Sequence, residues 1–200
     1  MTKRQADASV ALPTWEPTQE RILDAADTLI AGRGVRGVTI AELARRAQVS
    51  RPTIYRSWSD ADDVVRAALL RRVAALLSAF DASSPAGRDA IVDDVLRFSS
   101  RFRADPVYRH LLADEPEVFT RYTLERVGSS QRAILGWLAA AIATAQHSGT
   151  VRRDDPQAMA VMMLLITQSA LLSHGTVSEL IDEASWEREL RAALDGLLRP

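Results

Sequence analysis

Apolar residues recur at spacings of three and four along most of the 200-residue chain. Near the N-terminus, Ile22, Leu23, Ala26, Leu29 and Ile30 show this spacing clearly, and it returns in the later segments. No stretch sustains the period of two that half-buried strands require. The sequence therefore predicts an all-α fold, with three short helices followed by five or six longer ones.

Capping residues, prolines and glycines predict where these helices begin and end. The first helix runs from Thr18 to the glycines at 32–34. The second begins after Thr39, with Glu42 three residues later in the capping-box arrangement, and the third begins after Ser50. We expect the longer helices at about 60–80, 86–104, 106–113, 115–147, 155–173 and 184–198.

The composition is that of a soluble globular protein, with 47% hydrophobic and 26% charged residues. The chain has no cysteine, which excludes disulfides and thiolate metal sites. Its most apolar run, at 158–172, is too short to span a bilayer. We expect a cytoplasmic protein with no membrane partner, no metal site and no cofactor.

Charge is distributed unevenly along the chain. Residues 1–59 hold nine Lys or Arg against six Asp or Glu, a net charge of +3, whereas the remainder holds sixteen against twenty, or −4. This contrast favours a small anion-binding module attached to a larger body. We expect a flexible arm at 1–16, the anion-binding module at 17–59 and a larger helical domain at 60–200.

The stretch VSRPTIYRSW at 49–58 gives the third helix a polar and cationic leading end. A turn of three residues, Gln48 to Ser50, joins it to the second helix, which is the arrangement of a helix-turn-helix. Such a turn often has glycine where Gln48 stands, and a left-handed conformation there costs about 1–2 kcal/mol. Pro52 suits the first helical turn, where its missing amide hydrogen has no partner.

A helix that enters the major groove by this end presents Arg51, Thr53 and Arg56 to base edges or phosphates, and Tyr55 to a phosphate. Free amides near Thr39 and Ser50 are further phosphate ligands. The alternative is that these side chains only cover a packing seam. We prefer that alternative for Trp58, and we place Ile54 in the core, but three donors at one helix end favour DNA contact.

The run from Arg21 to Val65 resembles the N-terminal domain of TetR-family transcriptional regulators. The matching positions include Ile22-Leu23, Thr39-Ile40, Val49-Ser50 and Thr53-Ile54-Tyr55. The resemblance implies a homodimer that reads a palindromic double-stranded DNA operator, and a C-terminal domain whose small-molecule effector releases the DNA. We expect a repressor. The predicted DNA-binding residues are Thr39, Ser50, Arg51, Pro52, Thr53, Tyr55 and Arg56.

Two positions depart from the family pattern. The family commonly has glycine where Pro52 stands, so one amide donor is missing. It commonly has a phosphate-binding lysine where Ala61 stands, and its loss is expected to lower the DNA affinity and to reduce the salt dependence by somewhat under one unit of slope. Ala61 and the low net charge of −1 leave open a second function, a helical protein-interaction module whose helix-turn-helix no longer binds DNA.

The C-terminal half carries aromatic and methionine residues that suit either an ordinary core or a cavity for an apolar or aromatic effector. The predicted pocket residues are Phe98, Phe102, Phe119, Tyr122, Trp137 and Met162. The helix at 155–173 is apolar over much of its circumference and therefore needs neighbours on both sides, either in the core of one protomer or across a dimer axis. The predicted dimer residues are Met163, Ile166, Ala170, Trp186, Leu190, Leu194 and Leu197.

An enzyme is not expected. The three histidines are scattered, and no phosphate-binding glycine loop or nucleophile elbow is present. The aspartates at 60, 62 and 63 crowd a helix start, where the favourable interaction with the helix dipole accounts for them.

Overall fold

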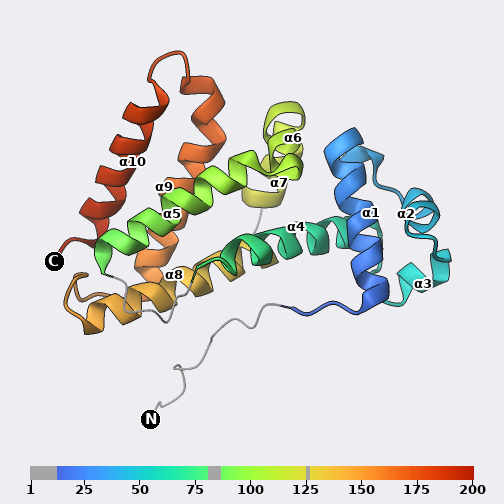
Figure 1. Cartoon of the computed structure of the whole chain (residues 1–200), viewed down its shortest axis with the longest axis horizontal. Helices are drawn as coiled ribbons and strands as arrows, with labels where there is room; N and C mark the ends of the chain where they lie inside the picture. Colours follow the sequence, from blue (N-terminus) through green and yellow to red (C-terminus); the bar gives the residue numbers. More distant parts are fainter. Residues whose placement is uncertain (1–12, 81–86, 125–126) are drawn as a thin grey trace, which may run out of the picture. The chain divides into compact units, whose positions relative to one another are not determined.

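The computed structural model describes residues 13–80, 87–124 and 127–200, and within these ranges it contains helices and no strands (Figure 1). This confirms the predicted all-α fold. Residues 1–12 of the predicted N-terminal arm lie outside the described residues. The helices are α1 Pro17–Arg33, α2 Ile40–Ala47, α3 Arg51–Tyr55, α4 Ala61–Leu77, α5 Arg88–Ala104, α6 Pro106–Asp114, α7 Pro116–Leu124, α8 Ser129–His147, α9 Pro156–Val177 and α10 Glu183–Leu198, with a short 3-10 helix, η1, at Val35–Gly37.

The prediction of one helix over 115–147 was wrong. The chain forms two helices there, α7 and α8. Gln131, in the first turn of α8, bonds across the break between them. Its Oε1 accepts from the amide of Gly128 at 3.0 Å, and its Nε2 donates to the carbonyl of Thr123 at 2.9 Å. Gly128 was the signal for this break, since glycine costs about 1 kcal/mol in a helix interior. In contrast, α9 continues through Gly175, where a stop was predicted.

The described helices group into two compact units, and the division does not fall at residue 60. Residues 12–75 and 102–131 form one, which we call the N-terminal unit, and residues 76–101 and 132–200 form most of the other, the C-terminal unit. The N-terminal unit therefore contains most of α4, together with α6 and α7, in addition to α1, α2 and α3. The functional domains predicted at 17–59 and 60–200 remain predictions.

The apolar faces of the N-terminal unit meet on α1. Its side chains Ile22, Leu23, Leu29 and Ile30 are at most 1% exposed. Helix α1 packs against both α2 and α6. Helix α6 is also bonded to α4, because the hydroxyl of the buried Tyr108 donates to the carbonyl of Leu69 at 2.8 Å.

Glu115, between α6 and α7, connects this end of the unit to the turn after α1. Its buried carboxylate accepts a hydrogen bond from the amide of Val35 at 2.6 Å. The neighbouring Gly34 has φ 71° and ψ 178°, a backbone conformation almost exclusive to glycine. A Cβ at Gly34 would lie 2.4 Å from the carboxyl carbon of Glu115, so only glycine admits this contact.

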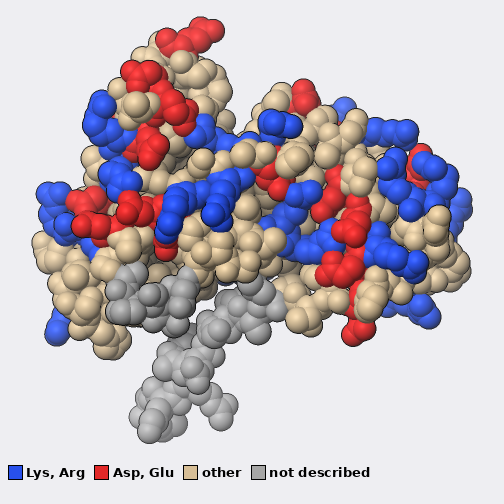
Figure 2. All heavy atoms as spheres, in the orientation of Figure 1, with Lys and Arg blue, Asp and Glu red and all other residues tan. Residues whose placement is uncertain are grey.

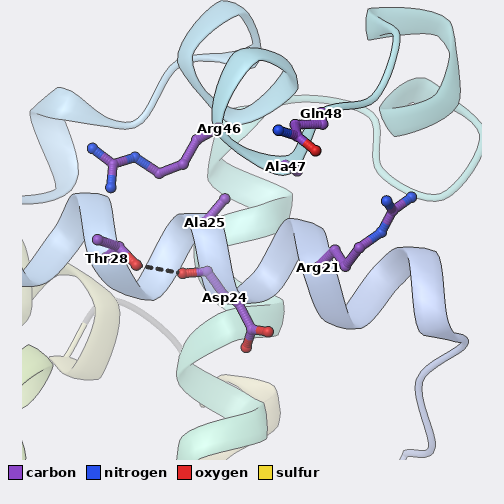
Figure 3. A pocket seen from close by; sticks show the side chains of 7 residues that line it. All are labelled: Arg21, Asp24, Ala25, Thr28, Arg46, Ala47 and Gln48. Carbon is purple, nitrogen blue, oxygen red and sulfur yellow. Dashed lines mark hydrogen bonds between the residues drawn. The ribbon is translucent and has the colours of Figure 1, made fainter.

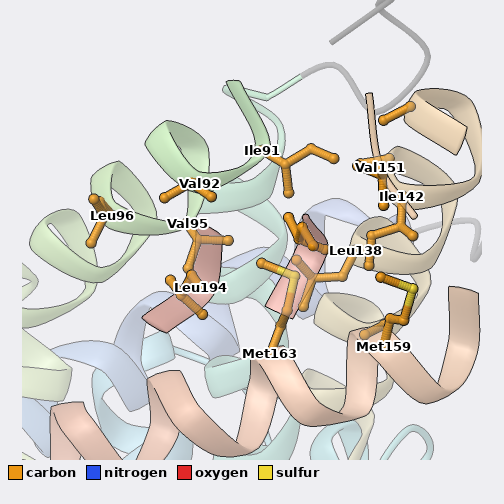
Figure 4. Packing of buried hydrophobic residues seen from close by; sticks show 14 of the residues in the cluster. Ile91, Val92, Val95, Leu96, Leu138, Ile142, Val151, Met159, Met163 and Leu194 are labelled. Carbon is orange, nitrogen blue, oxygen red and sulfur yellow. The ribbon is translucent and has the colours of Figure 1, made fainter. Parts of the chain in front are cut away.

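The C-terminal unit has a core built from α5, α8, α9 and α10 (Figure 4). Ile91, Val92, Ile142, Met159 and Met163 are each at most 1% exposed within it. Helix α9 has 22 residues and a mean hydropathy of 1.4 over its most apolar window. By length and composition it could cross a bilayer, whereas the run at 158–172 alone is too short. Only 28% of that window is buried, so much of α9 is left outside this core.

Gly34→Ala is expected to destabilise the protein by at least about 1–3 kcal/mol, since alanine is strained at this backbone conformation and its Cβ displaces the Glu115 carboxylate. Gly32→Ala is the matched control: Gly32 lies in the last turn of α1 with open space around it, and alanine favours a helix. Urea unfolding of both variants measures the difference. Equal stability of the two variants would contradict the requirement for glycine at position 34.

Candidate nucleic-acid interface

Helix α3 begins as the sequence predicts. Ser50 has the extended conformation of an N-cap, and its Oγ accepts from the amide of Thr53 at 3.3 Å, while the hydroxyls of the two residues lie 2.8 Å apart. Pro52 occupies the first turn. The hydroxyls of Ser50 and Thr53 thus hold each other in place at the leading end of the helix.

The side chains of α3 divide into a buried and an exposed face. Ile54 is fully buried, and Trp58, after the helix, is 7% exposed and stacks on Trp15 with ring centroids 6.4 Å apart. Tyr55, in contrast, is 55% exposed. This agrees with the prediction that Ile54 and Trp58 serve packing, and it leaves Tyr55 accessible to a partner.

The two arginines of the α3 segment, Arg51 and Arg56, are exposed, and neither pairs with an acidic side chain in the described part of the chain. Arg51 is the first residue of α3 and Arg56 caps its other end. Figure 2 shows basic side chains outnumbering acidic ones over α2 and α3 on the face in view. An unpaired guanidinium retains all of its donors for a phosphate or a base.

Thr39 caps α2, but the capping box is only half formed. Its Oγ1 accepts from the amide of Glu42 at 3.2 Å, as predicted. The Glu42 carboxylate does not reach back, because Arg45 and Arg33 bind it at 2.7 and 3.1 Å. The hydrogen bond from Arg45 lowers the pKa of Glu42.

The turn between α2 and α3 confirms the expected strain. Gln48 has φ 53° and ψ 48°, and it is the sole non-glycine residue with positive φ in the described ranges. Its conformation lets the chain enter α3 only three residues after the end of α2.

Helix α4 begins with acidic residues instead of a cation. Asp60 accepts from the amide of Asp63 at 2.7 Å, and Asp63 accepts from the amide of Ser59 at 3.0 Å. Hydrogen bonds from Ser59 and Arg66 lower the pKa of Asp63 to about 2. Ala61, the first residue of α4, offers no charge to a phosphate.

The six residues predicted to line an effector pocket fall in both units. Phe102, Phe119 and Tyr122 belong to the N-terminal unit, where Phe102 stacks on Tyr108 with centroids 3.8 Å apart and lies 6.1 Å from Phe119. Phe98, Trp137 and Met162 belong to the C-terminal unit. Phe98 is buried there, whereas Met162 is 47% exposed and therefore does not line an enclosed cavity within its own unit.

Three of the seven residues predicted for a dimer interface are core residues. Met163, Leu190 and Leu194 are buried in the C-terminal unit and have little surface to offer a second protomer. The other four, which are partly buried against that core, are Ile166, Ala170, Trp186 and Leu197. The exposed apolar side chains of α9 are instead Val161, Met162 and Leu165. A helix that is apolar all round does not reveal from sequence which side faces outward.

Glu115 is a structural contact to the helix-turn-helix module that sequence reasoning did not identify. The Glu-Pro pair at 115–116 was interpreted only as a helix start. The amide of Val35, to which Glu115 is bonded, lies 80 positions earlier in the chain, so no local sequence pattern predicts the contact.

A capped helix-turn-helix with an exposed, unpaired cationic tip defines the protein as a DNA-binding protein of the helix-turn-helix class. The family model of bacterial regulatory proteins of the tetR family matches residues 22–68. The chain is also 38% identical over 181 residues to the HTH-type transcriptional regulator Rv2250c of Mycobacterium tuberculosis, covering 90% of this chain and 94% of that one. The chain therefore belongs to the TetR family of transcriptional regulators and is not an enzyme.

Solved structures share the fold over most of the chain. The transcriptional regulator FadR of Bacillus subtilis, in complex with stearoyl-CoA, has a TM-score of 0.64 at 15% identity, covering 90% of this chain and 99% of its own. RolR, in complex with resorcinol, has a TM-score of 0.62 at 15% identity, covering 90% and 87%. At these identities the likeness establishes the fold alone.

Asp63→Asn is expected to remove part of the loss of stability in acid. The folded pKa of Asp63, about 2, lies below its ordinary value of 3.8, so this carboxylate stabilises the fold above pH 4 and loses that contribution as the pH falls towards 2. The variant should therefore be less stable at neutral pH and show a flatter decline between pH 4 and 2. Urea unfolding at several pH values between 2 and 7 measures the free energy of unfolding of the variant and of the wild type.

Asp89→Asn, which changes an exposed aspartate in the first turn of α5, is the control and should keep the wild-type decline. A variant at position 63 with the same pH profile as wild type would show that the bonds from Ser59 and Arg66 do not stabilise the fold.

Proposed function

We propose that the protein is a ligand-responsive repressor that binds a palindromic operator as a homodimer in the cytoplasm. The observation that carries this proposal is the leading end of α3, where Ser50 and Thr53 are held by capping bonds and Arg51 remains unpaired. Together with Thr39, Pro52, Tyr55 and Arg56, these residues make a donor-rich surface that suits a major groove and its phosphates.

A homodimer is supported by the exposed apolar stripe on α9, which we define as Val161, Met162 and Leu165. Two of these side chains are nearly half exposed, at 47% and 49%. Adjacent apolar side chains on the surface of a soluble protein mark an interaction site. A two-fold axis through this stripe would bury it against its own copy, and it would pair two α3 helices for a symmetric operator.

An apolar or aromatic effector is supported by the residues of the C-terminal half and by two relatives in fold. Phe98 is buried, and Trp137 packs, partly buried, against the apolar core of the C-terminal unit. FadR and RolR hold stearoyl-CoA and resorcinol, respectively, on the same fold. Acyl-CoA thioesters and hydroxybenzenes are therefore the first compounds to test for release of bound DNA.

Arg51→Ala and Tyr55→Ala are expected each to weaken specific DNA binding, with a loss of about 1–3 kcal/mol for a base-reading arginine. Duplexes selected from a random pool with the wild-type protein provide the operator, which is then titrated with each variant. Arg109→Ala, an exposed arginine on α6 away from α3, is the control for a simple loss of charge. We expect that the wild-type protein enriches a palindromic sequence. Binding to this sequence should be weakened in Arg51→Ala and Tyr55→Ala but not in Arg109→Ala.

If no sequence is enriched from the pool and the variants behave as wild type, the helix-turn-helix is a packing element. The protein would then be the helical interaction module considered above, and the proposal of a repressor would be wrong.

Leu165→Glu is expected to convert the dimer to monomers, because it buries a charge in the proposed interface. Leu180→Glu is the matched control, since Leu180 is 85% exposed in the turn after α9 and lies outside the stripe. Sedimentation equilibrium of the wild type and both variants measures the association. A Leu165→Glu protein that still dimerises as wild type would place the interface elsewhere.

A further inference from the structure

The arginines near the helix-turn-helix divide into paired and unpaired ones. Arg33 and Arg45 both bind Glu42, and Arg36 binds Glu117 at 3.1 Å. Arg21 and Arg46 are exposed and have no acidic partner among the described residues. The charge of a paired arginine is offset by its neighbouring carboxylate, whereas an unpaired arginine remains available to an anionic ligand.

Arg21 and Arg46 line the same shallow hollow between α1 and the end of α2, with a volume of about 290 Å³ (Figure 3). Arg21 comes from the second turn of α1 and Arg46 from the last turn of α2. The remaining lining residues are Asp24, Ala25, Thr28, Ala47 and Gln48. Figure 3 shows the two guanidinium groups at opposite ends of the hollow, one from each helix, so that each can bind a separate anionic group.

Asp24 is the one acidic residue of the hollow, and it does not neutralise the two arginines. Its carboxylate pairs with Arg71 of α4 at 2.9 Å. Figure 3 shows the carboxylate pointing away from both Arg21 and Arg46. No carboxylate of the hollow therefore offsets the charge of the two guanidinium groups.

The hollow borders directly on the leading end of α3. Gln48 lines it, and Ser50, two residues further on, caps α3. Two residues span at most about 7 Å of chain. The major groove is about 12 Å wide, with phosphates along both edges. A duplex that receives the tip of α3 in this groove thus brings one of its backbones close to the hollow.

We propose that Arg21 and Arg46 form a second phosphate-binding surface, on which each arginine binds one phosphate of the DNA backbone beside the groove that α3 enters. This inference rests on the proposed binding of DNA through α3. The ligand is the phosphodiester itself, which a guanidinium fork binds with two hydrogen bonds irrespective of sequence. The surface sets affinity and register, while Arg51 and its neighbours read the bases.

The test uses the full-length protein with Arg21→Gln, Arg46→Gln and the double variant, because glutamine removes the charge and retains the helix propensity. Arg45→Gln is the matched control, since this adjacent arginine on α2 loses the same charge but is already paired with Glu42. Binding to the selected operator and to a scrambled duplex is titrated against salt. Circular dichroism verifies that each variant is folded.

Each lost phosphate contact should reduce the magnitude of the slope of log affinity against log salt by about 0.9, so that over a tenfold range of salt the affinity of the variant falls about eightfold less than that of the wild type. We expect this reduction of the slope in both single variants, about twice as much in the double variant, and equally on operator and scrambled DNA. Slopes equal to that of Arg45→Gln would overturn the second phosphate-binding surface. A wild-type protein that binds neither duplex would instead overturn the proposed function, and the inference with it.

Discussion

The N-terminal unit depends on two adjacent arginines of α4. Arg71 binds Glu20, Asp24 and Asp27 of α1, the last two at 2.9 and 2.8 Å. Arg72 binds Asp27 at 3.2 Å and also Asp105, which caps α6. Burial raises the pKa of Asp27, and the two arginines oppose that shift. Removing one partner from such a partly buried network leaves charges unpaired, at a cost of about 3–5 kcal/mol for a fully buried pair. The network thus favours one arrangement of α1, α4 and α6.

This network explains why α6 belongs with the helix-turn-helix. Helix α6 is held at its start by Asp105, whose carboxylate accepts from the amides of Val107 and Tyr108 and also binds Arg72. At its other end, Glu115 binds the amide of Val35 in the turn that leads to α2. A displacement of α6 therefore breaks bonds to α1 and to the turn before α2. Because packed elements shift between discrete arrangements, a movement of α6 would be transmitted to α1 and to the turn before α2.

The sequence predicted those features that depend on neighbouring residues. Thr39, Ser50, Asp105 and Asp155 cap helices close to the predicted positions, and Ile54 is buried. Features that depend on distant residues were not predictable. Glu115 and Val35 meet across 80 positions, and the outward face of α9 follows from the packing of three other helices. The sequence therefore sufficed to propose the direct contacts of the DNA site. The division into two units and the exposed apolar face of α9 became apparent only in the three-dimensional structure.

Charge pairing, more than charge number, indicates where DNA contacts this protein. The net charge of +3 over residues 1–59 includes Arg33, Arg36 and Arg45, which are paired with Glu42 or Glu117, so that two carboxylates offset part of their charge. At the start of α4, Ala61 offers no cation and stands beside aspartates engaged in capping. Among the described residues of this module, the unpaired guanidinium groups are Arg51 and Arg56 around α3, and Arg21 and Arg46 beside the turn that precedes it. If the proposed phosphate contacts form, the cations that bind the DNA backbone lie beside the hollow between α1 and α2, and they compensate for the charge that Ala61 does not supply at the start of α4.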